Sequence, residues 1–356
     1  MLSCVPVRGR ARIRRAPPAL ARPCLHERKR TVSAETLEMH RTDPAVAQRM
    51  LRLRAGELAV AITPEVGGSI ASFSRHWNDA GRERELHWLR PASAEGLAQR
   101  NPLAMASFPL LPFCNRVRDG RAQFEGREID FPPNHPAEDS PHPLHGIGWQ
   151  RPWHVESARE DEVVLSLHVE AGPAWPWAFS ARQVVQLEPG RLRLQVELRN
   201  DDMAAMPAGI GHHPYFPHAP GTRLQTGTRA MWETDDEVMP TGLAEAPVVR
   251  QLREGALLAQ LHTDNNFTGW SRDARIDWPA DTSGPARRLR MQAEAPLDFF
   301  VLYCQRGYDY FCAEPVSQCT DWLNLAGRYG PDVLGGTRLT PGETLVARFT
   351  LAPQWD

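Results

Sequence analysis

The segment Arg191–Leu198 carries the pattern that most restricts the fold of this chain. Every second residue is apolar and the residues between are polar, which is typical of a β-strand with one buried face. The turn sequence Glu188-Pro189-Gly190 connects this segment to a second candidate strand, Phe179–Leu187. These residues predict a β-hairpin and commit this part of the chain to an antiparallel sheet.

Short apolar segments separated by turn residues recur after residue 50. The further candidate strands are Leu58–Ile62, Ile70–Phe73, Gln123–Phe131 with a turn at Gly126, Trp153–Ser157, Val163–Val169, Leu289–Ala293, Phe299–Tyr303 and Thr344–Leu351. Amphipathic helices are scarce, and 32 prolines and 26 glycines favour short strands joined by irregular loops. We therefore predict an all-β fold with few short helices, a single large antiparallel β-sandwich over residues 51–356.

Residues 1–50 differ from the rest of the chain. Met1–Arg30 is rich in arginine and proline and lacks the sustained apolar segment of a secretory signal peptide. Three interpretations stay open: a transit peptide, a basic tail that binds nucleic acid, or an extension upstream of a start at Met39 or Met50. We expect a disordered or artefactual extension and derive no function from it.

The charge and the cysteines exclude several classes of protein. A formal net charge of −2 gives no reason to expect nucleic acid or an anionic membrane as partner. No apolar segment approaches the ~18–20 residues of a membrane-spanning helix. The cysteines show neither a Cys-x-x-Cys pair nor zinc-ribbon spacing. We interpret Cys304, Cys312 and Cys319 as buried free thiols, and we expect a cytoplasmic protein.

Two adjacent histidines, His212 and His213, stand between small residues and a Pro-Tyr-Phe-Pro sequence. Neighbouring residues of a strand point to opposite faces, so the two imidazoles cannot share one role. One is expected to face a pocket and exchange a proton near neutral pH, and the other to be structural. The alternative interpretation is a buried aromatic corner with one hydrogen-bonded histidine.

Glu314 is a second candidate for proton transfer. It stands in the apolar segment Phe311–Pro315, where we expect a strand that ends at the proline. Burial would raise the pKa of this carboxyl and make it a better base near neutrality. A lone acid in apolar surroundings is unfavourable unless it is paired or used, so we favour a functional role over a structural one.

Two further polar segments lie between candidate strands. Asn115-Arg116 follows the apolar segment Phe108–Cys114, which suggests an arginine at the rim of a buried site, where its planar group can bind ligand oxygens. The segment Asp264–Trp270 has two interpretations. It is either an Asx-turn between strands or a loop whose carboxylate holds sugar hydroxyls.

His142 and His145 are three residues apart, so a cupin-like metal site has to be considered. Prolines on both sides of His142 make this pair a poor regular metal face, and we expect no metal and no cofactor. His145 precedes Gly146, which suits a loop where the backbone comes close to a ligand.

These positions together suggest a proton-transfer site, and the chain resembles the aldose 1-epimerase (galactose mutarotase) family over about residues 50–353. The matching motifs occur in the order of the family: Gly67-Gly68 with Ile70, Asn115-Arg116, Leu144-His145-Gly146, His213-Pro214-Tyr215-Phe216, Asp264-Asn265-Asn266-Phe267 and Cys312-Ala313-Glu314-Pro315. The resemblance implies a large β-supersandwich fold, which agrees with the strand pattern.

The resemblance also implies a role for each site residue. Glu314 would be the general base that takes the proton of the anomeric hydroxyl, and His213 the general acid that protonates the ring oxygen. Reclosure of the open-chain aldehyde on its other face gives the opposite anomer. His145 would donate a hydrogen bond near the ring or anomeric oxygen. Sugar hydroxyls would be held by Asn115, Arg116 and Asp264.

The implied function is interconversion of the α and β anomers of a free monosaccharide by a monomer or homodimer. One alternative is a non-catalytic sugar-binding or sugar-sensing protein on the same scaffold. Another is a hexose-phosphate mutarotase, which would need several arginines at the mouth of the site. Arg118 and Arg121 are near Arg116 in the sequence without forming a decisive cluster. Pro217 and Val316 depart from the better-known galactose mutarotases and leave the sugar open.

Overall fold

The computed structural model describes residues 50–136, 138–281 and 284–355. The predicted extension, apart from Met50, lies outside these ranges. Contacts divide the chain into Met1–His40 and Arg41–Asp356, and every described residue belongs to the second unit. Within the described ranges, no helix is long and apolar enough to cross a membrane.

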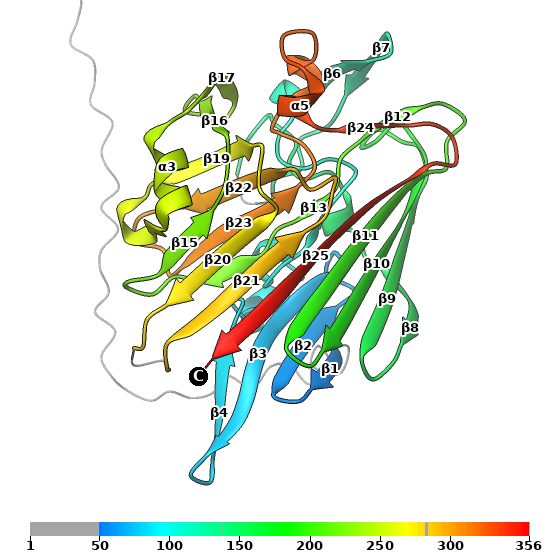
Figure 1. Cartoon of the computed structure of the whole chain (residues 1–356). Helices are drawn as coiled ribbons and strands as arrows, with labels where there is room; N and C mark the ends of the chain where they lie inside the picture. The colour runs from blue at the N-terminus through cyan, green and yellow to red at the C-terminus, as the bar shows by residue number, and fades with distance from the viewer. Residues whose placement is uncertain (1–49, 137, 282–283, 356) are drawn as a thin grey trace, which may run out of the picture. The chain divides into compact units, whose positions relative to one another are not determined.

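Strands dominate the described residues, with about 51% strand and 11% helix, and every pair of neighbouring strands in the sheets is antiparallel. The prediction of a large antiparallel β-fold with few short helices is confirmed. Figure 1 shows the long strands of the largest sheet running diagonally beside a second large sheet.

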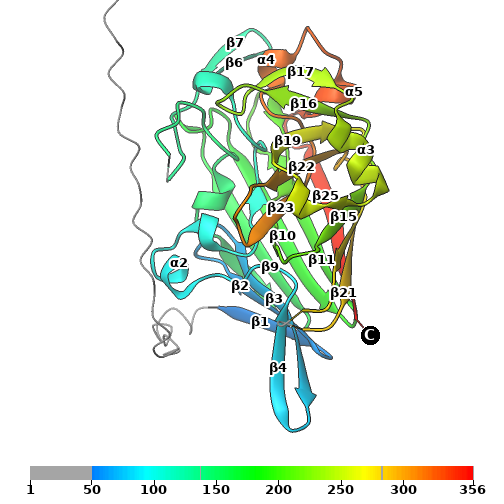
Figure 2. The same ribbon diagram turned by 90° about the vertical axis from the view of Figure 1, so that its left-hand side faces the viewer.

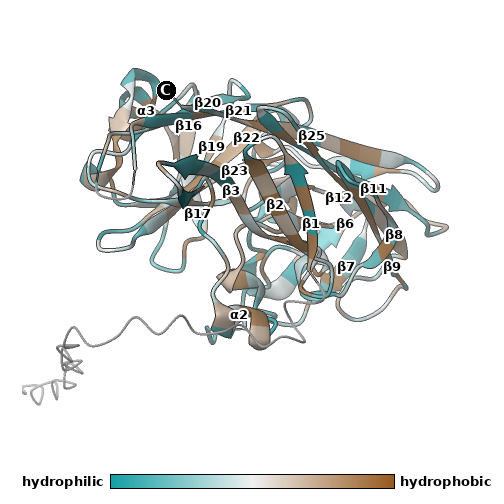
Figure 3. Ribbon diagram, turned by 90° about the horizontal axis from the view of Figure 1, so that it is seen from below, coloured by the Kyte–Doolittle hydropathy of each residue, from teal (hydrophilic) through white to brown (hydrophobic). Residues whose placement is uncertain are grey.

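The largest sheet has nine strands and contains the predicted hairpin. In order of pairing its strands are β18 (Ala256–Leu257), β15 (Arg223–Thr226), β20 (Asp273–Trp278), β21 (Arg287–Ala293), β25 (Thr344–Trp355), β11 (Arg191–Asn200), β10 (Phe179–Glu188), β9 (Glu162–Val169) and β8 (His154–Ala158). The apolar residues of β11 are buried and most residues between them are partly or fully exposed. Burial alternates in the same way along β25, and Figure 3 shows how hydrophobic and hydrophilic residues are distributed along the strands.

The second large sheet has eight strands. They are β17 (Pro240–Ala244), β16 (Ala230–Thr234), β19 (Thr263–Thr268), β22 (Phe299–Cys304), β23 (Tyr310–Val316), β13 (Gly211–His212) and β5 (Pro109–Leu110), with β14 (Tyr215–Pro217) also paired to β23. Both β13 and β14 pair with β23, in the registers Gly211↔Val316 and Tyr215↔Cys312. This register places His213, between the two short strands, opposite Glu314.

Smaller elements complete the fold, and Figure 2 shows several of them from the side. The smaller sheets are β1 (Leu51–Ala55), β2 (Leu58–Thr63), β3 (Ser69–Asp79) and β4 (Arg82–His87); β6 (Arg121–Phe124) with β7 (Arg127–Asp130); and β12 (Met206–Ala208) with β24 (Thr337–Leu339). The helices are α2 (Ala94–Ala98), α3 (Pro247–Glu254), α4 (Trp322–Leu325) and α5 (Pro331–Leu334), with short 3₁₀ turns η1 (Pro102–Ala104), η2 (Arg118–Gly120), η3 (Gly148–Gln150) and η4 (Leu258–Gln260).

One continuous apolar core joins the inner faces of the sheets. It contains Phe73 of β3, Leu194 of β11 and Phe300 of β22, which are buried to 2% exposure or less. The three cysteines predicted to be buried thiols, Cys304, Cys312 and Cys319, are buried and free.

Two local predictions were wrong. Pro315 does not end its strand, because β23 continues to Val316 and Pro315 pairs with Phe300. A proline is tolerated inside a strand where the ladder does not need its missing N–H. The segment after Thr263 is not an Asx-turn, since β19 runs through it to Thr268.

Candidate active site

A pocket of about 260 Å³ lies on the eight-stranded sheet. All six side chains predicted from the sequence line it, from positions between residues 115 and 314: Asn115, Arg116, His145, His213, Asp264 and Glu314. The tertiary structure therefore brings the predicted residues together, and their roles in a reaction stay predictions.

His213 and Glu314 form the centre of the pocket. The register between β23 and residues 211–217 sets them opposite each other, and directly opposed side chains of an antiparallel pair lie close together. The Nε2 of His213 is 3.2 Å from Oε1 of Glu314. The two residues are 8% and 2% exposed, and His213 Nδ1 and Glu314 Oε2 have no hydrogen-bond partner in the protein.

Burial controls the protonation of this pair. It lowers the pKa of His213 to about 3, because water no longer stabilises the imidazolium. It raises the pKa of Glu314 well above its ordinary value, and the nearby Asp264 carboxylate raises it further. Both shifts favour an uncharged pair that holds one exchangeable proton between the two side chains.

Aromatic rings fix the His213 imidazole. Phe108 stacks on one side at a centroid distance of 4.7 Å, and Tyr215 stacks at 4.6 Å. His145 approaches edge-on at 5.1 Å. Phe216 does not share in this wall, because it stacks on Phe311 instead. Tyr215 and Phe216 are neighbours in one strand and so face opposite sides.

His212 has the structural role expected of the second histidine. It is fully buried and exchanges hydrogen bonds with Ser107 Oγ and with Gln183 Oε1, the latter at 3.1 Å. Both of its ring nitrogens are thus occupied within the core. Only His213 of this pair lines the pocket.

His145 is held as a hydrogen-bond donor. The backbone N–H of Asn115 donates to Nδ1 of His145 at 3.1 Å, so the neutral imidazole carries its proton on Nε2. Burial lowers the pKa of His145 well below its ordinary value, and the ring stays neutral. Both residues have left-handed backbone conformations, with φ of 61° at His145 and 59° at Asn115.

Gly146 is needed for backbone packing within the protein. It was expected to let the backbone approach a bound molecule, but a Cβ added there would lie 2.1 Å from the carbonyl oxygen of Leu111. Residues 111 and 146 form a parallel bridge. The glycine therefore lets two backbone segments approach closely, which seats the loop that carries His145.

Two rows of residues cross the pocket floor. Cys312 pairs with Tyr303, which in turn pairs with Asp264, so one row runs across three strands. Glu314 pairs with Val301 and begins the second row, two residues along β23.

Burial raises the pKa of the half-buried Asp264, while the Arg116 guanidinium acts to lower it. Asp264 and Arg116 thus lie close enough to interact at one side of the pocket.

Several lining residues were missed by the sequence analysis. They are Tyr303, Tyr308, Tyr310, Cys312, His135 and Glu138. The alternation of a strand offered one signal, because residues 310, 312 and 314 share a face. Nothing local distinguishes the remaining residues from ordinary strand and loop positions.

A metal ion has one set of candidate ligands among the described residues. Donor atoms of His213, Cys312 and Glu314 all lie within 4.8 Å of one another. Burial raises the pKa of the Cys312 thiol well above its ordinary value, so the thiolate that metal binding requires is disfavoured. The pair considered from the sequence does not form a site: His142 accepts the N–H of Asp119 and does not line the pocket.

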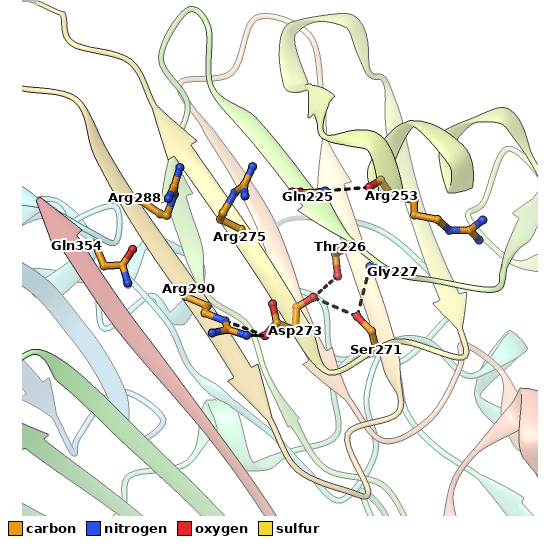
Figure 4. Close-up of a pocket in the computed structure, with 10 residues that line it drawn as sticks. All are labelled: Gln225, Thr226, Gly227, Arg253, Ser271, Asp273, Arg275, Arg288, Arg290 and Gln354. Atoms are coloured by element: carbon orange, nitrogen blue, oxygen red, sulfur yellow. Dashed lines mark hydrogen bonds and ion pairs between the residues drawn. The ribbon is translucent and has the colours of Figure 1, made fainter.

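A second cavity, of about 420 Å³, lies on the nine-stranded sheet and is called here the arginine-lined hollow. Its arginines are Arg253, Arg275, Arg288 and Arg290 (Figure 4). Asp273 pairs with Arg290, while Asp277 pairs with Arg275 and Arg288. No histidine lines this hollow, and its lining offers no buried acid and base.

Comparison with known proteins identifies the family. The model of the aldose 1-epimerase family matches residues 49–352. The uncharacterised protein YphB of Escherichia coli K12 is 29% identical over 85% of this chain and 98% of its own length. A crystal structure from Escherichia coli K12, assigned provisionally as an aldose 1-epimerase, has a TM-score of 0.73 and 27% identity, covering 86% of this chain and 99% of its own.

A galactose mutarotase-like protein from Clostridium acetobutylicum shares the fold, with a TM-score of 0.71 at 20% identity over 85% of this chain and 94% of its own. The family model covers most of the sequence, including all six predicted site residues. The chain therefore belongs to the aldose 1-epimerase family.

Proposed function

We propose that this protein is an aldose 1-epimerase that interconverts the α and β anomers of a neutral free aldose. The observation that carries the proposal is the buried contact of 3.2 Å between His213 Nε2 and Glu314 Oε1. Each partner also has a buried polar atom without a hydrogen bond in the protein. Such atoms are unfavourable unless a ligand satisfies them.

In the proposed reaction, ring opening moves two protons and breaks the C1–O5 bond. Ring closure moves the protons back and forms that bond again. Glu314 takes the proton of the anomeric hydroxyl as O1 forms a carbonyl with C1. The C1–O5 bond breaks, and the imidazolium of His213 gives its proton to O5. Rotation about C1–C2 turns the aldehyde, and O5 attacks its other face while both protons return. Each positioned acid or base contributes roughly 10²–10⁴-fold.

The contact between the two side chains supplies the reactive charge state. Burial favours a protonated Glu314 and a neutral His213. Transfer of that one proton across 3.2 Å converts the pair into a carboxylate and an imidazolium, which are the base and the acid of the reaction. The pair thus needs no proton from solvent to become active.

Three neighbours would position the sugar. His145 presents an Nε2–H donor, which suits a hydrogen bond to O5 or O1. Arg116 and Asp264 offer a donor group and an acceptor group to hydroxyls further around the ring. Asn115 contributes through its backbone, which fixes the His145 tautomer.

The lining charges favour a neutral sugar over a sugar phosphate. Arg118 is 3.5 Å from Asp235 and 3.7 Å from Asp321, away from the pocket. Arg121 lines a different cavity. The pocket itself has one arginine, Arg116, and three carboxyl groups. A phosphate dianion would meet repulsion there that a hydroxyl does not.

Exchange NMR and polarimetry on a panel of aldoses would test the proposal. We expect the purified protein to accelerate anomer exchange for at least one aldose, and Glu314→Gln to remove the acceleration. Buffer-rate exchange with every sugar would refute the proposal. Sugar binding at buffer-rate exchange would instead identify a sugar-binding protein on this scaffold. We further expect a monomer or homodimer that acts in the cytoplasm, where its thiols stay reduced.

A further inference from the structure

Three tyrosines gather at one end of the pocket, where β22 turns into β23. Tyr303 and Tyr310 stack at a centroid distance of 6.2 Å with 15° between their planes. Tyr308 meets them edge-on at 6.2 Å and 5.3 Å. All three line the pocket that contains Glu314, so one aromatic surface continues from the pocket to the turn.

Tyr308 is exposed in a way that packing does not explain. It is 48% exposed. Among the described residues, Met203 is the one other large hydrophobic side chain that is exposed. Its two partners are half-buried. Burial of a tyrosine ring against its neighbours is favourable, so a ring left half in water at a pocket mouth is a candidate ligand contact.

The position of the cluster fits the far end of a bound sugar. Tyr310 and Glu314 lie on the same face of β23, four residues apart, which corresponds to ~13 Å along a strand. The proposed reaction holds O1 and O5 of the sugar against the Glu314–His213 pair. The tyrosines line the same pocket, so in the proposed orientation the opposite side of the sugar ring, with O4 and O6, points toward them.

The size of the pocket limits what it encloses. Its volume of about 260 Å³ is below the ~300–1,000 Å³ typical of sites for drug-sized ligands. One monosaccharide unit is therefore the most that we expect inside. A second sugar joined to O4 or O6 would lie outside, over the exposed ring of Tyr308.

The cluster of Tyr303, Tyr308 and Tyr310 is anchored to the protein through Tyr310. The Arg90 guanidinium lies 4.5 Å from the centroid of Tyr310 and 3.8 Å from that of Tyr215, and it donates to the carbonyl oxygens of Leu103 and Met105. Aromatic faces suit the C–H surface of a neutral sugar. An ordered aromatic surface of this kind requires little rearrangement on binding.

We propose that Tyr308, supported by Tyr303 and Tyr310, forms a second sugar subsite. The substrate is then the reducing end of a neutral disaccharide or longer oligosaccharide. This inference rests on the proposed function for the placement of the reducing sugar, and the binding experiment below is independent of catalysis.

Calorimetric titration tests the subsite. Wild-type protein is titrated with glucose and galactose, and with the 1,4- and 1,6-linked disaccharides that have these sugars at the reducing end. We expect at least one disaccharide to bind about fivefold more tightly than its reducing monosaccharide, as an aromatic contact of ordinary strength would give. Equal or weaker binding of every disaccharide would overturn the inference.

Variants assign the gain to the ring. Tyr308→Ala should bring the disaccharide and monosaccharide affinities together, whereas Tyr308→Phe, which keeps the ring, should preserve the difference. Met203→Ala removes the other exposed apolar side chain and should change neither affinity. A ratio that persists in Tyr308→Ala would contradict the assignment. Melting curves verify the fold, and the wild-type comparison stands without any variant.

Anomer exchange measured on the same sugars separates the two proposals. Tighter disaccharide binding without accelerated exchange would support the subsite and refute the epimerase function. Accelerated exchange of monosaccharides without any disaccharide gain would support the function and refute the subsite.

Discussion

The candidate active-site pocket and the arginine-lined hollow differ in how deeply their charged residues are buried. The hollow is the larger cavity and holds four arginines, whose side chains at 275, 288 and 290 are 44–52% exposed. The pocket holds the His213–Glu314 pair, whose side chains are 10% and 3% exposed. The hollow thus has more charge, and the pocket has fewer charged groups with far less water around them.

This difference determines where chemistry can occur. Exposed ion pairs such as Arg288–Asp277 are screened by water and contribute about 0–1 kcal/mol. Burial instead moves the pKa values of His213 and Glu314 in opposite directions from their ordinary values. The candidate active site is therefore distinguished by its unpaired buried atoms, and not by cavity volume or the number of charged residues.

The strongest test of the contrast removes the buried acid. Glu314→Gln keeps the shape of the side chain and removes its proton chemistry, so kcat/KM for anomer exchange should fall by roughly 10²–10⁴-fold. The variant should melt at or above the wild-type temperature, because a buried ionisable carboxyl is unfavourable to folding near neutral pH. The matched control, Asp277→Asn, removes the partner of two arginines of the hollow and should retain wild-type activity. Wild-type kcat/KM in Glu314→Gln would show that the pair is not catalytic.

A second substitution tests whether the pair acts as a unit. His213→Asn should lower kcat/KM by at least ~10²-fold, since the general acid is lost. The double variant with Glu314→Gln should be little slower than the slower single variant, because residues that act together are not additive. Exchange NMR on all three variants measures this. Losses that multiply fully would indicate two independent contributions.

The pH profile tests the effect of burial. The proposed mechanism needs one exchangeable proton on the pair. The pair gains a second proton only as pH falls toward the lowered pKa of His213, about 3, and loses its only proton as pH rises through the raised pKa of Glu314. We expect a broad bell-shaped profile of kcat/KM with a plateau that includes neutral pH.

Asp264→Asn sharpens this prediction. The Asp264 carboxylate helps to raise the pKa of Glu314, so its removal should lower that pKa and move the alkaline limb to lower pH. The acid limb should stay in place. An alkaline limb that is unchanged or moves to higher pH would contradict the electrostatic coupling between the two carboxyl groups.

The smallest expected effect belongs to the hollow. Asp277→Asn breaks the ion pairs with Arg275 and Arg288, whose nitrogen–oxygen distances are 2.8 Å and 2.6 Å. These partners are exposed, so the free energy of unfolding should fall by about 0–1 kcal/mol, and by less at high salt. Urea denaturation at two salt concentrations measures the change. A loss of several kcal/mol would contradict the distinction between the weak, exposed ion pairs of the hollow and the buried pair of the pocket.

The sequence predicted the regular strands well. The hairpin of β10 and β11 follows from strict alternation around Glu188-Pro189-Gly190, and the structure contains it with only small changes at the ends. Strands such as β16 and β19 were missed, because their burial comes from neighbouring strands and not from their own pattern. The same cause made Asp264 look like part of a turn.

The sequence by itself determined the residue types available for proton transfer and the motifs that carry them, because these are local properties of the chain. Only the tertiary structure decided that they meet. The registers Gly211↔Val316 and Tyr215↔Cys312 set His213 opposite Glu314. Long-range pairing depends on the whole sheet, so no local pattern encodes it. The structure likewise left Tyr308 exposed at the mouth of the pocket.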